Sequence, residues 1–278
     1  MLMLRLAFLA AITFLLGACA TTPPSAPPLS KDQIAAIVAS PDRRAADRTN
    51  DLRRKPEQML AFIEVRPGMV ALDLSAGGGY TTELIARAVG PTGRVYGQSR
   101  PRNPDQQAPG PVVPEGGAAP AAAAPRPAAP PNSAQALAER AKNPAAGNIT
   151  AVVQRFEDPV PAEFASNGLD LVTLMFNYHD LGWIGVDRAQ MNRAVFAALK
   201  RGGIYVIADH SGRPGTGISE SGTLHRVEEA FLRKEVEAAG FRLVAEGNFL
   251  RNPNDPRNKN TPDPPQPKDE FVLKFVKP

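Results

Sequence analysis

The sequence is poor in residues that support disulfide bonds or nucleic-acid binding. Among 278 residues there are one cysteine and three histidines, and the formal net charge is only +4. A single cysteine leaves no partner for a disulfide within the chain. The basic residues between positions 43 and 55 alternate with acidic ones, a pattern that predicts a solvated helical face. The composition therefore gives no reason to expect a nucleic-acid partner.

No apolar run at the N-terminus is long enough to anchor the chain by spanning a membrane. Residues 1–19 begin with a short basic segment and continue with an apolar core, as signal peptides do. They end in Leu16-Gly17-Ala18-Cys19, which resembles the lipobox of bacterial lipoprotein signal peptides. The alternative is an ordinary secretory signal that happens to contain a cysteine.

The lipobox resemblance implies that Cys19 is lipidated and becomes the mature N-terminus. Residues 20–30, rich in Pro, Ser and Ala, would then form a tether to the membrane. Ala20 follows the cysteine where an aspartate would favour retention in the inner membrane. The expected location is therefore the periplasmic face of the cell envelope, lipid-anchored in the outer membrane.

A short apolar strand, a glycine turn and a helix occupy residues 70–87. The pattern of the turn comprises Asp73, Ser75, Gly77, Gly78 and Gly79. A strand that enters a helix through glycines brings backbone N–H groups and the helix N-terminus close to a ligand. Thr82 stands where a dinucleotide fingerprint needs its third glycine, and no Lys-Ser/Thr pair follows to form a phosphate-binding loop.

This turn resembles the first motif of class I S-adenosylmethionine (SAM)-dependent methyltransferases. The resemblance covers residues 56–277 and includes a Lys200-Arg201-Gly202-Gly203 turn before an apolar strand. It implies a three-layer, Rossmann-like domain over residues 31–278. Its sheet would have about seven strands, mostly parallel, with an antiparallel C-terminal strand. It also implies that the turn residues hold SAM as the cofactor.

Further cofactor contacts are expected from Gln98, Glu157 and Asn177, which follow later strands of the sheet. In the family, an acidic residue at the end of the second strand accepts both ribose hydroxyls, and Gln98 can accept only more weakly. The position expected to contact adenine aligns best with Arg155, with Glu157 slightly beyond it. Both departures from the family pattern weaken the expectation of tight SAM binding.

Residues 100–132 are a low-complexity stretch of Pro, Ala and Gly. Such a segment cannot bury enough apolar surface to offset its chain entropy, so it is predicted to be a disordered insert. It replaces most of the helix that should connect the second and third strands. Residues 133–140 are predicted to be the remainder of that helix.

Two histidines are predicted at the carboxyl edge of the sheet. His179 and Asp180 follow the fourth strand, and Asp209 and His210 follow the fifth. These strands should be neighbours, and open α/β sheets bind their ligands at this edge. His225, the third histidine, follows a Gly-rich loop and opens a helix predicted to run from Leu224 to Ala239.

Three interpretations of these residues remain open. The histidines and their acidic neighbours could act as a general base or contact the substrate. They could bind a divalent metal, although the chain has no locally spaced metal motif such as H-E-x-x-H. They could also simply cap strand ends.

The sequence thus predicts a SAM-dependent methyltransferase-like protein acting on an unidentified small molecule or envelope acceptor. SAM is a cytoplasmic metabolite, however, and a lipoprotein domain faces away from it. The alternative is a non-catalytic envelope lipoprotein that uses the pocket for another ligand or partner. A metal-dependent hydrolase built on the same scaffold is a third possibility.

Overall fold

The computed structural model describes residues 26–101, 132–260, 262 and 266–278. The predicted signal peptide of residues 1–19 lies outside the described residues, as do most of the predicted tether and most of the predicted insert. In the part of the chain that is described, no helix is both long enough and apolar enough to cross a membrane.

A single seven-stranded sheet forms the centre of the domain, in the order β3-β2-β1-β4-β5-β7-β6. Neighbouring strands are parallel except where β7 pairs antiparallel with both β5 and β6. The strands are β1 (Val70–Leu74), β2 (Arg94–Ser99), β3 (Ile149–Val153), β4 (Leu169–Met175), β5 (Leu199–His210), β6 (Arg242–Gly247) and β7 (Glu270–Val276). The predicted fold class, with its antiparallel C-terminal strand, is confirmed.

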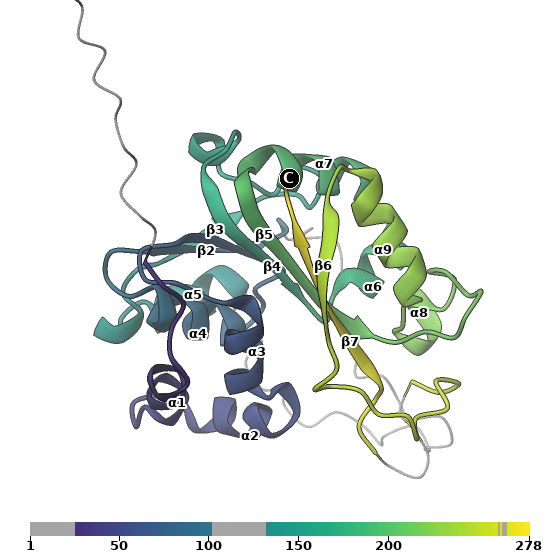
Figure 1. The fold of residues 1–278 in the computed structure, drawn as a ribbon, viewed down its shortest axis with the longest axis horizontal. Coiled ribbons are helices and arrows are strands. Elements are labelled where there is room, and N and C mark those ends of the chain that lie inside the picture. The colour runs from purple at the N-terminus through teal and green to yellow at the C-terminus, as the bar shows by residue number, and fades with distance from the viewer. Residues whose placement is uncertain (1–25, 102–131, 261, 263–265) are drawn as a thin grey trace, which may run out of the picture.

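Helices cover both faces of this sheet and complete the three layers (Figure 1). One layer contains α1 (Lys31–Ala39), α2 (Ala45–Arg54), α3 (Pro56–Ile63), α4 (Tyr80–Val89) and α5 (Ser133–Arg140). The other contains α6 (Tyr178–Trp183), α7 (Arg188–Ala198), α8 (Ser221–Leu224) and α9 (Glu229–Ala238). Two short 3-10 turns, η1 (Pro144–Ala146) and η2 (Ala162–Phe164), lie in loops.

The inner strands contribute alternate side chains to two separate apolar clusters, because successive residues of a strand face opposite sides of the sheet. In β5, Tyr205 and Ile207 pack with the α7 and α9 side. Val206 and Ala208 pack with the α3 and α4 side. The inner strands β1, β4 and β5 are therefore buried on both faces, which is why they read in the sequence as nearly continuous apolar runs.

The structure differs from the sequence-based expectation at two helices. The helix expected from Leu224 to Ala239 is interrupted at His225, whose φ of 50° ends α8 before α9 begins. The basic and acidic run around α2 was expected to be solvated, and most of it is exposed, but two of its charged residues are not. Arg43 and Asp47 are only 4% and 5% exposed, because each has a charged partner inside the domain.

Candidate functional site

The glycine turn leads from β1 into the N-terminus of α4 and leaves space in front of two of its glycines. Gly77 and Gly78 are exposed, and a Cβ added at Gly78 would meet no atom within 4 Å. Gly79 is buried instead, and a Cβ there would lie 2.7 Å from Leu137 and 2.8 Å from Arg140. A ligand can therefore approach the backbone at Gly77 and Gly78, whereas Gly79 packs against α5.

Asp73 lies beneath the turn and does not face the open space. Its two carboxylate oxygens accept hydrogen bonds from the hydroxyls of Thr82, at 2.6 Å, and Thr173, at 2.7 Å. Burial raises the pKa of Asp73 to about 6, although both hydroxyls oppose this shift by stabilising the charged form. Asp73 thus ties β1 to α4 and β4 and supports the turn from behind.

Gln98 is fully buried, and both polar atoms of its side chain are already engaged. Its Oε1 accepts the backbone N–H of Ser75 at 3.0 Å, and its Nε2 donates to the carbonyl of Gln154 at 2.7 Å. In this arrangement Gln98 supports the turn and presents no exposed acceptor to a ribose hydroxyl. Glu157, beyond β3, lies 3.3 Å from the Nε of Arg155.

Helix α5 fixes the turn from its other side. The Ser133 hydroxyl donates to the carbonyl of Gly77 at 2.7 Å, and the Arg140 guanidinium donates to the carbonyl of Gly78. Arg140 also forms buried ion pairs with Asp47, at 2.6 Å, and with Glu83. One guanidinium therefore joins α2, α4, α5 and the glycine turn.

A chain of hydrogen bonds runs from the glycine turn to the histidines. The Ser75 hydroxyl lies 2.6 Å from Oδ1 of Asn177, and Asn177 Nδ2 donates to Oδ2 of Asp180 at 2.6 Å. The other oxygen of Asp180 lies 3.2 Å from Nε2 of His179 and 3.1 Å from Nδ1 of His225. The predicted cofactor residues and the predicted catalytic residues therefore belong to one polar network.

His179 is buried between two carboxylates. Its Nδ1 lies 2.6 Å from Oδ1 of Asp209, and Oδ2 of Asp209 accepts the backbone N–H of His179 at 2.8 Å. Burial opposes the charged imidazolium, but Asp209 and Asp180 outweigh it and raise the pKa of His179 to about 9. Burial also opposes ionisation of Asp180, yet the two histidines lower its pKa to about 2.

The predicted proximity of His179 and His210 is confirmed, since their ring centroids are 5.3 Å apart. His210 nevertheless belongs to a different set of contacts. Its Nδ1 lies 2.9 Å from Oε1 of Glu270 without the alignment of a hydrogen bond. Burial lowers the pKa of His210 to about 2, so it is a neutral, enclosed ring.

Helix α2 closes this edge of the sheet, a contribution that the sequence did not reveal. The Arg54 guanidinium lies 3.9 Å from the ring centroid of Phe176, which directly follows β4, and Arg53 pairs with Glu270 at 2.8 Å.

Phe176 and Ser75 both have positive φ, at 59° and 55°. Such conformations are costly for these residue types and concentrate at functional sites.

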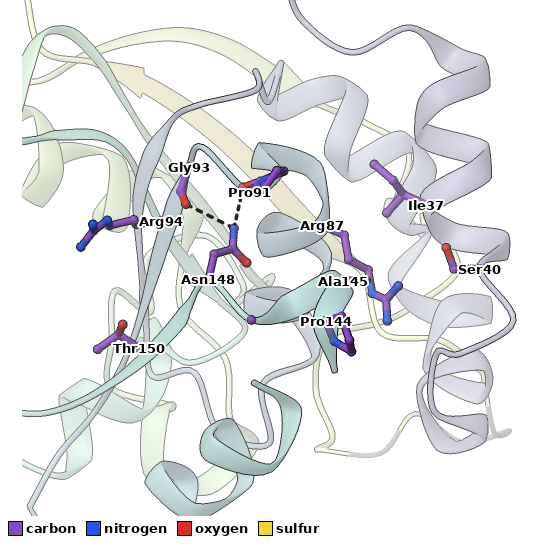
Figure 2. Close-up of a pocket in the computed structure, with 12 residues that line it drawn as sticks. Ile37, Ser40, Arg87, Pro91, Gly93, Arg94, Pro144, Ala145, Asn148 and Thr150 are labelled. Carbon is purple, nitrogen blue, oxygen red and sulfur yellow. Dashed lines mark hydrogen bonds between the residues drawn. The ribbon is translucent and has the colours of Figure 1, made fainter. Parts of the chain in front are cut away.

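A hollow of about 700 Å³ lies elsewhere, near the amino ends of β2 and β3 (Figure 2). Two of its polar side chains are already paired. Asn148 donates to the carbonyls of Ala86 and Gly90 at 3.0 and 2.9 Å, and Arg87 pairs with Asp42 at 2.8 Å. It contains no cluster of titratable groups comparable to the histidine edge, so we place the candidate site at the glycine turn and the histidines.

Comparison with known proteins supports the fold. No family model matches the chain, and no curated protein matches it. A SAM-dependent methyltransferase from Aquifex aeolicus is similar with a TM-score of 0.55 and 15% identity, over 90% of this chain and 100% of that one. A protein from Galdieria sulphuraria, described as a sarcosine dimethylglycine methyltransferase, has a TM-score of 0.53 and 14% identity. The match covers 89% of this chain and 98% of that one.

A third structure, from Haloferax volcanii, is a complex of the Trm112 methyltransferase activator with a methyltransferase. It gives a TM-score of 0.50 and 16% identity, over 90% of this chain and 99% of that one. At these identities the likeness establishes the fold, which is that of class I methyltransferases. A fold of this kind supports many activities, so function has to be argued from the site.

Proposed function

We propose that the chain is a SAM-dependent methyltransferase-like protein that acts on a small molecule or an envelope component. The observation that carries this proposal is the continuous network from Ser75 through Asn177 to Asp180 and His179. It links a glycine turn at the start of a helix to a cluster of protonatable groups. Cofactor and acceptor would therefore meet at one edge of the sheet.

The fit to SAM is good at the turn and poor at the ribose position. Gly77 and Gly78 leave their backbone open, and the N-terminus of α4 favours an anionic group such as the SAM carboxylate. Ser75 and Asn177 add polar atoms beside them. Gln98, in contrast, is fully buried and presents no exposed acceptor to the ribose hydroxyls. We therefore expect weaker SAM binding than an acidic residue at position 98 would give.

The remaining residues would position the acceptor. When bound, SAM supplies a methyl group on a positively charged sulfur. Asp180 and His225 are partly exposed and can orient an acceptor hydroxyl or amine by hydrogen bonds. Asp209 holds His179, and His179 together with Asn177 holds Asp180. His210 and Glu270 lie beside His179 and are mostly buried.

A non-catalytic binding protein is the second candidate, and the engaged side chain of Gln98 favours it. In that case the same opening would hold a different ligand or partner. Both candidate functions include lipidation at Cys19 and a location in the outer membrane. This location would also separate the domain from cytoplasmic SAM.

Calorimetric titration with SAM and S-adenosylhomocysteine separates the two candidates. Gly78→Leu adds bulk only to the open space, so it should abolish binding and leave the melting temperature nearly unchanged. Gly147→Ala is the matched control, because its Cβ would make only ordinary contacts of 3.7 Å or more beside the distant hollow. No heat with either ligand, or equal binding by wild type and Gly78→Leu, would refute the proposed SAM site.

A further inference from the structure

We infer that His179, Asp180 and His225 form a binding site for a divalent transition-metal ion. One ligand atom from each of the three residues lies within 4.8 Å of the others. The Oδ1 atom of Asp180 is 3.2 Å from Nε2 of His179 and 3.1 Å from Nδ1 of His225. Ligand atoms about 2.0–2.1 Å from a shared ion lie roughly 3.0–3.4 Å from one another, so both of these separations suit a shared ion.

The surroundings of His179 match those of a metal-ligating histidine. Its Nδ1 is hydrogen-bonded to the fully buried Asp209, which leaves Nε2 directed toward Asp180. Metal-bound histidines almost always donate their second ring N–H in this way, because the partner fixes the tautomer and the ring orientation. Asp209 in turn is held in place by the backbone N–H groups of His179 and His210.

The charge balance also favours a dication. Within the described ranges, the ion pairs of Asp180 and Asp209 are to histidines and not to lysine or arginine. With both imidazoles neutral, as metal ligands must be, the two carboxylates carry a charge of −2. A divalent ion would neutralise this charge, whereas protonation of the imidazoles is the competing solution.

The backbone at His225 indicates that its position is specifically held. His225 has φ 50° and ψ 56°, a left-handed conformation that interrupts the α8–α9 region and turns the ring toward Asp180. Two nitrogens and one carboxylate oxygen suit zinc, iron, cobalt or nickel better than magnesium or calcium. The side chains of Asp180 and His225 are 28% and 35% exposed, so an oxygen ligand from outside could complete the coordination.

The three residues offer fewer ligands than a closed structural site, so a substrate could occupy an open position. This role rests on the proposed function, since it would bring an acceptor oxygen close to the glycine turn. Binding of the ion itself does not depend on SAM, and the two can be measured separately.

The only tryptophan of the chain provides a direct probe of the site. Trp183 Nε1 lies 3.3 Å from Oδ1 of Asp180, and the side chain is largely exposed. Untagged full-length protein carrying Cys19→Ser, which removes the only thiol, is stripped with chelator and titrated with Co²⁺. We expect saturable quenching of Trp183 fluorescence and a zinc calorimetry stoichiometry of one.

Calorimetry with Zn²⁺ then compares variants in the same background. Asp180→Asn and His225→Asn should each weaken binding at least tenfold, and asparagine tolerates the backbone of position 225. Asp32→Asn, at an exposed position of α1, is the matched control for Asp180→Asn, and its zinc affinity should stay within twofold of wild type. The absence of a one-to-one wild-type site, or equal affinities in all variants, would overturn the inference. Zinc binding without SAM binding would leave the metal site intact and remove the proposed function.

Discussion

The Nδ1 atom of His179 lies 2.6 Å from Oδ1 of Asp209, and both side chains are buried. Because the same carboxylate also accepts two backbone N–H groups, Asp209 is fixed and in turn fixes the imidazole. The α6 segment that carries His179 is thereby attached to the end of β5. This relationship sets the orientation of the whole polar edge.

Removing the negative charge of Asp209 should change the titration of His179. In metal-free buffer, Asp209→Asn should lower the pKa of His179 below its wild-type value of about 9, because the charged imidazolium loses a buried carboxylate partner. Nuclear magnetic resonance can follow the ring protons, and with three histidines in the chain the assignment is simple. Asp187→Asn, at the N-cap of α7, is the control. An unchanged pKa in Asp209→Asn would contradict the prediction.

Arg140 should be essential for stability around the glycine turn. Arg140→Met leaves Asp47 as a buried carboxylate without its partner, whereas Glu83 keeps its ion pair with Arg87. The loss should lower the free energy of unfolding by about 3–5 kcal/mol. Urea denaturation measures this loss. Lys142→Met, which removes a fully exposed pair with Glu139, should leave the midpoint unchanged. Equal effects of the two substitutions would show that the Arg140 cluster does not support the turn.

The sheet could be predicted from the sequence because its signals are local. Apolar runs and the glycine turn each fix one strand or helix end, and the parallel order follows from the family pattern. The Gly202-Gly203 turn expected before the fifth strand lies instead inside β5. The proximity of His179 and His210 followed from the same topology, since they end neighbouring strands.

Contacts between distant segments could not be predicted in this way. Asp47 forms an ion pair with Arg140, which is 93 residues away in the sequence, and Arg53 pairs with Glu270, which is 217 residues away. The sequence of α2 gives no indication of these distant partners, so the helix was expected to face solvent. The grouping of His225 with His179 likewise depends on one backbone angle, which interrupts an otherwise regular helical pattern.

Lipidation of Cys19 predicts that the protein fractionates with membranes after labelling with a fatty-acid analogue. Cys19→Ser should abolish the label and leave the chain soluble or unprocessed, because no other thiol is available. Fractionation followed by detection of the label measures both effects. Wild-type protein that is unlabelled and fully soluble in the cytoplasm would refute the lipoprotein hypothesis and remove the main objection to SAM as cofactor.

Asp73 should make the stability of the domain depend on pH in the acidic range. Its pKa is 3.8 in the reference state and about 6 in the folded protein, so the folded state binds more protons between these values. The contribution is fully present below pH 4 and is lost as the pH rises through 6. Two pKa units correspond to about 3 kcal/mol.

The difference in free energy of unfolding between wild type and Asp73→Asn isolates this contribution. Asparagine can still bond both Thr82 and Thr173, so the variant should fold and should lack this part of the pH dependence. Measured by urea denaturation at pH 4, 5, 6 and 7, the stability of wild type relative to the variant should fall with rising pH. Asp32→Asn, at an exposed position of α1, should instead follow the wild-type curve. Parallel curves for wild type and Asp73→Asn would mean that the buried carboxyl is ionised throughout, with Arg54 compensating its charge.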